Sequence, residues 1–138
     1  MFSMTTRAKG REMVKSAKDL VAEANTSVKT MPAAEAAKLV GTHDAVFVDL
    51  REQDELQKTG RIRGAIHVPR GFLEFQADPS SPTHKAGLDP DKRIVLFCGS
   101  GSRSALAAKT LGEMGFANVA HVQGGFPALR DAGAPVDQ

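Results

Sequence analysis

The sequence contains no tryptophan, no tyrosine and only one cysteine, Cys98, among its 138 residues. One cysteine cannot form an internal disulfide, and no second cysteine completes a metal-binding pair or a redox couple. The four histidines, at positions 43, 67, 84 and 121, lack the close spacing of a zinc site. We therefore expect a chain that works in a reducing compartment, with no metal and no other cofactor.

An excess of one charge is also missing, because 18 Lys and Arg face 16 Asp and Glu for a net charge of +2. This balance does not favour a polyanion-binding protein, and seven dispersed Phe offer no stacking platform for single-stranded nucleic acid. We expect no nucleic-acid partner.

Long apolar runs are absent too, which argues against a membrane span and against the apolar block of a signal peptide. Basic residues lead the sequence as they do in a transit peptide, but acidic residues follow from Glu12 onward. We therefore expect a cytoplasmic protein with no membrane partner.

The length fits one domain with an N-terminal extension. Apolar residues between positions 13 and 28 recur at helical spacing and predict an amphipathic helix. We assign 1–27 to a helical extension and 28–138 to the domain. We expect the helix to pack on the domain; the alternative is a surface for a partner or a second copy.

The remaining sequence alternates short apolar runs with helix-forming segments. The runs 45–48 and 94–97 are continuous, as in strands buried on both faces of a parallel sheet, and 65–68 and 119–122 predict further strands. Helices are predicted over 30–41, with Thr30 as the N-cap, and over 52–58, 104–114 and 127–132. Prolines make 72–92 an irregular surface excursion. This alternation predicts an α/β fold with helices on both faces of a parallel sheet.

Cys98 ends the 94–97 strand and precedes a predicted helix, a position where α/β sheets bind ligands. Small residues let the loop amides converge, and the helix N-terminus adds positive potential. Such a setting, with Arg103 as a nearby cation, lowers a thiol pKa and creates a nucleophile. The candidate site therefore comprises Cys98 and the loop residues Gly99, Ser100, Gly101, Ser102 and Arg103.

The alternative is an inert Cys98, since a lone cysteine after a buried strand is most often a small core side chain. Inertness does not call for two glycines, two serines and an arginine in the next five positions. The loop composition therefore favours a reactive thiol, although a glycine-rich turn that merely joins strand to helix has the same appearance.

Four sequence blocks together resemble the rhodanese family, in its order and spacing. They are 48–52 (VDLRE), 60–69 (GRIRGAIHVP), 98–104 (CGSGSRS) and 124–126 (GGF), with a closing GAPV at 133–136. The resemblance spans about residues 28 to 136. It implies a five-stranded parallel sheet flanked by helices.

The resemblance also implies a chemistry. Active members of the family take sulfane sulfur from a small anionic donor such as thiosulfate, release sulfite, and carry a persulfide to cyanide, a thiol or a protein. By match to the motif, Cys98 would be the nucleophile and 99–103 the binding loop.

Two alternatives remain. The related phosphatases and arsenate reductases have five residues between the cysteine and the arginine, whereas four lie between Cys98 and Arg103. The shorter loop suits one sulfur atom better than a tetrahedral oxyanion. The other alternative is a rhodanese-fold binding module without catalysis, which would have no need for the thiol.

Four polar residues lie in or beside these motifs. Asp49 and Arg51 are predicted to form a structural pair that shapes the site, and His67 to be a hydrogen-bonded structural residue. Arg70 could equally orient an anionic donor or be an ordinary exposed arginine. Phe126 stands where many family members have tryptophan, with no functional change expected.

Overall fold

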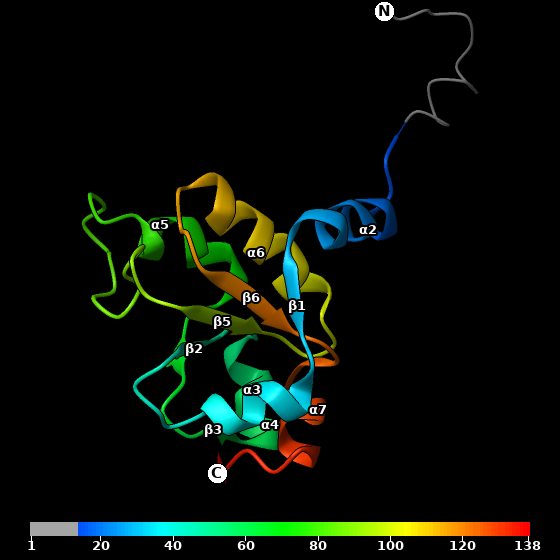
Figure 1. Cartoon of the computed structure of the whole chain (residues 1–138), viewed down its shortest axis with the longest axis vertical. Coiled ribbons are helices and arrows are strands. Elements are labelled where there is room, and N and C mark those ends of the chain that lie inside the picture. The colour runs from blue at the N-terminus through cyan, green and yellow to red at the C-terminus, as the bar shows by residue number, and fades with distance from the viewer. Residues whose placement is uncertain (1–13) are drawn as a thin grey trace, which may run out of the picture.

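A parallel five-stranded sheet is the centre of the computed structural model, which describes residues 14–138 (Figure 1). The strand order is β1-β6-β5-β2-β4, and every pair is parallel. The strands are β1 (Lys29–Met31), β2 (Val46–Asp49), β4 (Ile66–His67), β5 (Ile94–Phe97) and β6 (Val119–Val122). The predicted α/β fold and the five-stranded sheet are confirmed.

Helices cover both faces of this sheet (Figure 1). On one face α2 (Ala17–Ser27) and α5 (Leu73–Ala77) pack against α6 (Ser102–Glu113), and on the other α3 (Ala33–Leu39) packs against α7 (Gly125–Asp131) near α4 (Gln53–Thr59). The two layers bury separate apolar clusters because strand side chains alternate between faces. In β5, Leu96 and the following Cys98 join the cluster on the α6 side, while Val95 and Phe97 join the other.

A second, two-stranded antiparallel sheet pairs β3 (Arg61–Ile62) with β7 (Val136–Asp137). This small sheet was not predicted, because two residues are too few for a periodic pattern. Arg63 and Asp137 add an exposed ion pair beside it, with 2.8 Å between Nη2 and Oδ1. The C-terminal segment is thereby attached to the chain that precedes β4.

The predicted N-terminal helix is present as α2 but begins at Ala17 rather than at residue 13; Met13 lies outside the described residues. Ser16 is its N-cap and forms a capping box with Asp19, which fixes the start. Ala24 is fully buried, and the helix packs along α6. The division between 1–27 and 28–138 remains a prediction.

Two local predictions were wrong. Thr30 does not cap a helix: it lies in β1 beside β6, and the helix begins after Pro32. The 72–92 segment is not only a surface excursion, since it contains α5 after a 3-10 turn at Arg70–Phe72, and Leu73, Ala77 and Leu88 are fully buried. The pairing of β1 with β6 decided the first outcome and the packing of α5 against α6 decided the second, and local propensity reports neither.

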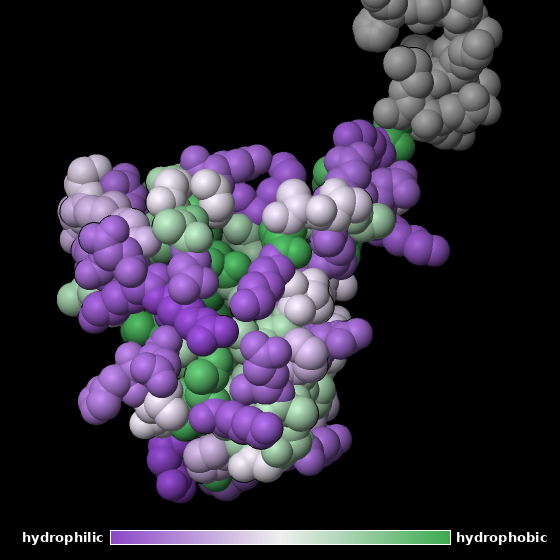
Figure 2. Space-filling model, in the orientation of Figure 1, coloured by the Kyte–Doolittle hydropathy of each residue, from purple (hydrophilic) through white to green (hydrophobic). Residues whose placement is uncertain are grey.

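Polar side chains cover much of the face seen in Figure 2, with smaller apolar areas between them. Among residues 14–138, the structure contains no helix with both the length and the apolar character needed to cross a membrane.

Candidate active site

Cys98 follows β5 at the carboxyl edge of the sheet, and a tight loop leads from it into α6. Gly101 is the residue before the helix and has φ of 115°, a conformation that strains residues with a Cβ atom. Glycine at position 101 is therefore a requirement of the backbone path. The loop turns back over the sulfur instead of extending away from it.

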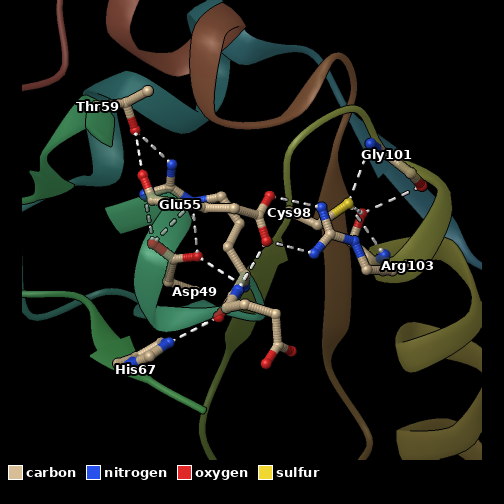
Figure 3. Close-up of polar contacts among 10 residues, drawn as sticks. Asp49, Glu55, Thr59, His67, Cys98, Gly101 and Arg103 are labelled. Atoms are coloured by element: carbon tan, nitrogen blue, oxygen red, sulfur yellow. Dashed lines mark hydrogen bonds and ion pairs between the residues drawn. The ribbon is translucent and has the colours of Figure 1, made fainter. Parts of the chain in front are cut away.

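The loop directs polar groups at the Cys98 sulfur (Figure 3). The backbone N–H groups of Gly101 and Ser104 donate to Sγ, at 3.1 and 3.4 Å. The Ser104 hydroxyl lies 3.6 Å from the same atom. Cys98 is fully buried, so these groups are its immediate polar environment. The predicted convergence of loop amides occurs at the sulfur itself.

This environment lowers the pKa of the Cys98 thiol below its usual value. Burial acts in the opposite direction, because it disfavours the charged thiolate. Hydrogen bonds from the Ser104 hydroxyl and from the amides of Ser100, Ser104 and Gly101 outweigh burial. Cys98 therefore differs from an inert core cysteine, in which burial acts alone.

Arg103 lies near enough to Cys98 for the two charges to interact, as expected of a nearby cation, but its charge is not free. Its guanidinium is paired with Glu55 of α4, with Nη1–Oε2 at 2.8 Å and Nη2–Oε1 at 3.0 Å (Figure 3). The Arg103 hydrogen bond, partly offset by burial, lowers the pKa of Glu55 to about 2. Hydrogen bonds, rather than an unpaired arginine, therefore dominate the thiol environment.

Gly125, the second glycine of the GGF block, explains why that block lies beside the loop. It has φ of 68°, and a Cβ there would collide with the Cys98 carbonyl oxygen. The Phe126 N–H donates to the same oxygen at 2.7 Å. The start of α7 therefore holds the end of β5 and fixes the first residue of the loop.

Asp49 and Arg51 form a buried ion pair, as predicted, with 2.9 Å between Nη2 and Oδ2 and both side chains at most 3% exposed. Arg51 also donates to the Thr59 hydroxyl and the Gly60 carbonyl. Its guanidinium lies 4.0 Å from the centroid of the Phe126 ring. The guanidinium thus has partners throughout, and the pair links the ends of β2 and α4 to α7.

His67 and Arg70 lie beside this region without touching the Cys98 loop in the contacts found among residues 14–138. His67 Nε2 donates to the Arg51 carbonyl at 2.6 Å, which fits the predicted structural role. Arg70 pairs with Glu74 at 2.9 Å and approaches the Thr110 hydroxyl at 3.4 Å. Its expected alternative role toward a donor gains no support from these contacts.

Three residues of the site escaped the sequence analysis. Glu55 was hidden because its partner Arg103 is 48 positions away, and Ser104 was named only as the end of the 98–104 block and the start of a helix, with no role at the sulfur. His121 lies on β6, 3% exposed, with Nδ1 at 2.9 Å from the Ser104 hydroxyl. Only the strand order β6-β5 brings this histidine to the loop. No three His, Cys, Asp or Glu side chains within residues 14–138 gather as a metal site requires.

Comparison with known proteins shows which family combines this fold with this loop. A family model described as a rhodanese-like domain matches residues 32–132. The chain belongs to the rhodanese family. The match covers four of the five strands, all except β1, and it includes the entire Cys98 loop.

Two solved structures show the family likeness over most of the chain. A protein of unknown function from Rhodopseudomonas palustris CGA009, described as a possible tyrosine phosphatase, has 44% identity and a TM-score of 0.84, covering 91% of this chain and 96% of its own. The polysulfide-sulfur transferase homodimer of Wolinella succinogenes has 29% identity and a TM-score of 0.70, covering 99% and 93%.

Curated relatives include whole proteins and domains of longer ones. A sulfurtransferase from Allochromatium vinosum is 28% identical over 99 residues, which are 72% of this chain and 84% of the relative. A tRNA uridine(34) hydroxylase from Hamiltonella defensa is 35% identical over 96 residues, 70% of this chain but 26% of the relative. The chain thus spans about a quarter to two fifths of the longer relatives. Sulfurtransferases among the relatives support an enzyme of the sulfur-transfer superfamily.

Proposed function

We propose that this chain is a cytoplasmic sulfurtransferase that carries sulfane sulfur on Cys98. The observation that carries the proposal is the set of polar groups at the Cys98 sulfur: the N–H groups of Gly101 and Ser104, which donate to Sγ, and the Ser104 hydroxyl 3.6 Å away. They favour the thiolate, which is the nucleophilic form of cysteine. A purely structural cysteine has no need of them.

In the proposed first half-reaction, the Cys98 thiolate attacks the outer, sulfane sulfur of a donor such as thiosulfate. A new S–S bond forms on Cys98, the S–S bond of the donor breaks, and its electron pair leaves with sulfite. In the second half-reaction the nucleophilic acceptor, cyanide or a thiolate, attacks the terminal sulfur, and Cys98 departs as a thiolate. The loop amides that stabilise the thiolate also stabilise the negative persulfide.

The loop length supports sulfur over a larger oxyanion. Four residues separate Cys98 from Arg103, one fewer than in the related phosphatases and arsenate reductases, and the N–H groups of Gly101 and Ser104 lie 3.1 and 3.4 Å from the sulfur. A donor anion would approach Arg103, whose guanidinium lies over Gly99: its Nη2 atom is 3.0 Å from the point where a Cβ would lie if residue 99 had a side chain. We propose that the donor competes there with Glu55.

A turnover assay with thiosulfate and cyanide tests the proposed function. The wild-type chain is expected to form thiocyanate and sulfite in equal amounts, and Cys98→Ser is expected to form neither, because serine leaves no thiolate. Glu113→Gln is a matched surface control, since it removes only the exposed pair with Lys109. A wild-type chain that forms no thiocyanate with thiosulfate or with a persulfide donor would contradict the proposal.

Hydrolysis of an aryl phosphate should be measured on the same samples. The neighbour from Rhodopseudomonas palustris is described as a possible tyrosine phosphatase, so this activity is the relevant competitor. We expect none above the Cys98→Ser background. Phosphate hydrolysis without sulfur transfer would instead favour phosphatase chemistry, and partner binding that persists in a chain with neither activity would favour a binding module.

A further inference from the structure

A hydrogen-bonded chain leads from the buried Cys98 sulfur to the exposed Asn25 of the N-terminal helix. The sulfur lies 3.6 Å from the Ser104 hydroxyl, and that hydroxyl lies 2.9 Å from Nδ1 of His121. On the far side of the ring, Nε2 lies 3.0 Å from the Asn25 Oδ1 atom and 3.1 Å from the Thr30 hydroxyl. Four elements, α6, β6, α2 and β1, thus contribute one residue each beyond the cysteine.

The partners of His121 determine which ring nitrogen carries the proton. The Asn25 Oδ1 atom is an acceptor only, so Nε2 must donate to it. In the neutral ring, Nδ1 is then left with its lone pair and accepts from the Ser104 hydroxyl. The ring therefore presents a base toward the hydroxyl that contacts the thiol.

From this arrangement we infer that His121 takes the Cys98 proton through Ser104, and that Asn25 of the N-terminal helix holds the imidazole in the tautomer that can accept it. The thiol proton passes to the Ser104 oxygen while the Ser104 proton passes to His121 Nδ1. The products are a thiolate and an imidazolium, so charge is conserved. Ser104 then donates to the thiolate, and the imidazolium donates to Ser104.

The groups in contact with His121 are neutral, which leaves Cys98 as its partner for proton exchange. Its contacts from α2, β1 and α6 are the neutral Asn25, Thr30 and Ser104, and Cys98 is the other titratable group in the chain of hydrogen bonds. A cavity of about 380 Å³ meets the ring, and its lining, which includes Asn25, Thr30 and Gln123, carries no charged side chain. No neighbouring carboxylate in this lining competes for the role of counter-ion to the imidazolium.

Burial opposes the imidazolium and lowers the pKa of His121 below its usual value, so an isolated His121 would stay neutral near pH 7. A thiolate two hydrogen bonds away offsets this effect. The two groups then titrate as a pair, and their apparent pKa values belong to the pair. The Ser104 hydroxyl also approaches the Gly101 carbonyl at 3.2 Å, a longer contact than the one to His121.

The inference deepens the proposed function by adding two positioning residues, His121 and Asn25, to its nucleophile. In the donor reaction, thiol, imidazole and thiosulfate would become persulfide anion, imidazolium and sulfite, with the total charge unchanged. The retained imidazolium would balance the persulfide charge until the sulfur is passed on.

We call this proton transfer from Cys98 through Ser104 to His121 the relay. Ultraviolet absorbance of the thiolate, measured against pH, tests the relay without requiring sulfur transfer. The chain suits this measurement, because one cysteine supplies the signal and no tyrosine or tryptophan obscures it. The relay predicts that His121→Ala raises the Cys98 pKa by about one unit, since it removes the proton acceptor and its positive charge. Ser104→Ala should also raise it, and the matched control His84→Gln should not change it.

A merely structural His121 predicts the opposite sign. If the ring stays neutral, it only draws the Ser104 hydroxyl away from the sulfur, so His121→Ala frees that hydroxyl to stabilise the thiolate and lowers the Cys98 pKa. A lowered or unchanged value overturns the relay. This holds whether or not the chain transfers sulfur, so the relay and the proposed function can fail separately.

Asn25→Asp provides a second test that leaves the core side chains in place, should His121→Ala not fold. A carboxylate beside Nε2 favours the imidazolium, so the His121 pKa, followed by nuclear magnetic resonance of the ring, should rise by about one unit and the Cys98 pKa should fall. A raised His121 pKa with an unchanged Cys98 pKa would overturn the relay, because the two groups would not be coupled.

Discussion

Arg103 brings a positive charge to the Cys98 loop, and Glu55 cancels much of it. Both side chains are about one-third exposed, so a solute anion can reach the pair. Glu55 has a second function, because its Oε2 atom accepts from the Glu52 N–H at the start of α4. At the residue scale, the site combines a stabilised thiolate with an arginine whose charge becomes available to an anion when its pair with Glu55 opens.

Glu55→Gln should strengthen the binding of an anionic donor. Glutamine can still accept a hydrogen bond from Arg103 but does not neutralise it, so the KM for thiosulfate should fall about fivefold, corresponding to about 1 kcal/mol. Steady-state kinetics at fixed ionic strength measure the effect, with Glu113→Gln as the matched control. A KM that stays the same or rises would show that Glu55 does not compete with the donor.

Single residues also mark the limit of what the sequence could predict. Cys98 and its small neighbours were recognisable because the loop is contiguous and its chemistry depends on local composition. His121 and Asn25 were not, since they are 96 positions apart and meet through the pairing of β1 with β6. Arg103 was found, but its neutralisation by Glu55 depends on where α4 packs.

At the scale of elements, the Glu55–Arg103 pair joins α4 to the start of α6. The strands β5 and β6 matched their predicted bounds because each is a short, mostly apolar run bounded by residues that interrupt the apolar pattern. Elements defined by distant pairing did not: β1, β3 and β7 are two or three residues long, and local pattern does not distinguish such segments from loops. The buried α5 was obscured by the prolines that follow it.

The inter-element pair predicts an acid-dependent loss of stability. The pKa of Glu55 is about 2 in the folded chain against an ordinary value of 4.5, so the pair stabilises the fold above pH 4.5 and loses that effect as pH falls toward 2. Solvent screening limits the contribution to about 1 kcal/mol. Between pH 5 and pH 2.5, the wild type should lose more unfolding free energy in urea than Glu55→Gln does. Equal losses would refute this assignment.

At the scale of the whole molecule, both layers of the fold converge on one edge of the sheet. Strand β5 presents the cysteine, α6 and its loop supply the amides, and α7 holds the Cys98 carbonyl from the other side. The relay proposed above would add α2, so that the N-terminal helix serves the site and is not an appendage. The family assignment required the whole set of motifs, whereas the donor and acceptor depend on surfaces that those motifs do not describe.

Intact mass spectrometry after incubation with thiosulfate tests the central claim most directly. Samples free of reducing agent should gain the mass of one sulfur atom, lose it on addition of cyanide, and show neither change in Cys98→Ser. Because Cys98 is the only cysteine, no other thiol can account for the adduct. A wild-type chain whose mass never changes with thiosulfate or a persulfide donor, or an adduct that persists in Cys98→Ser, would contradict the account.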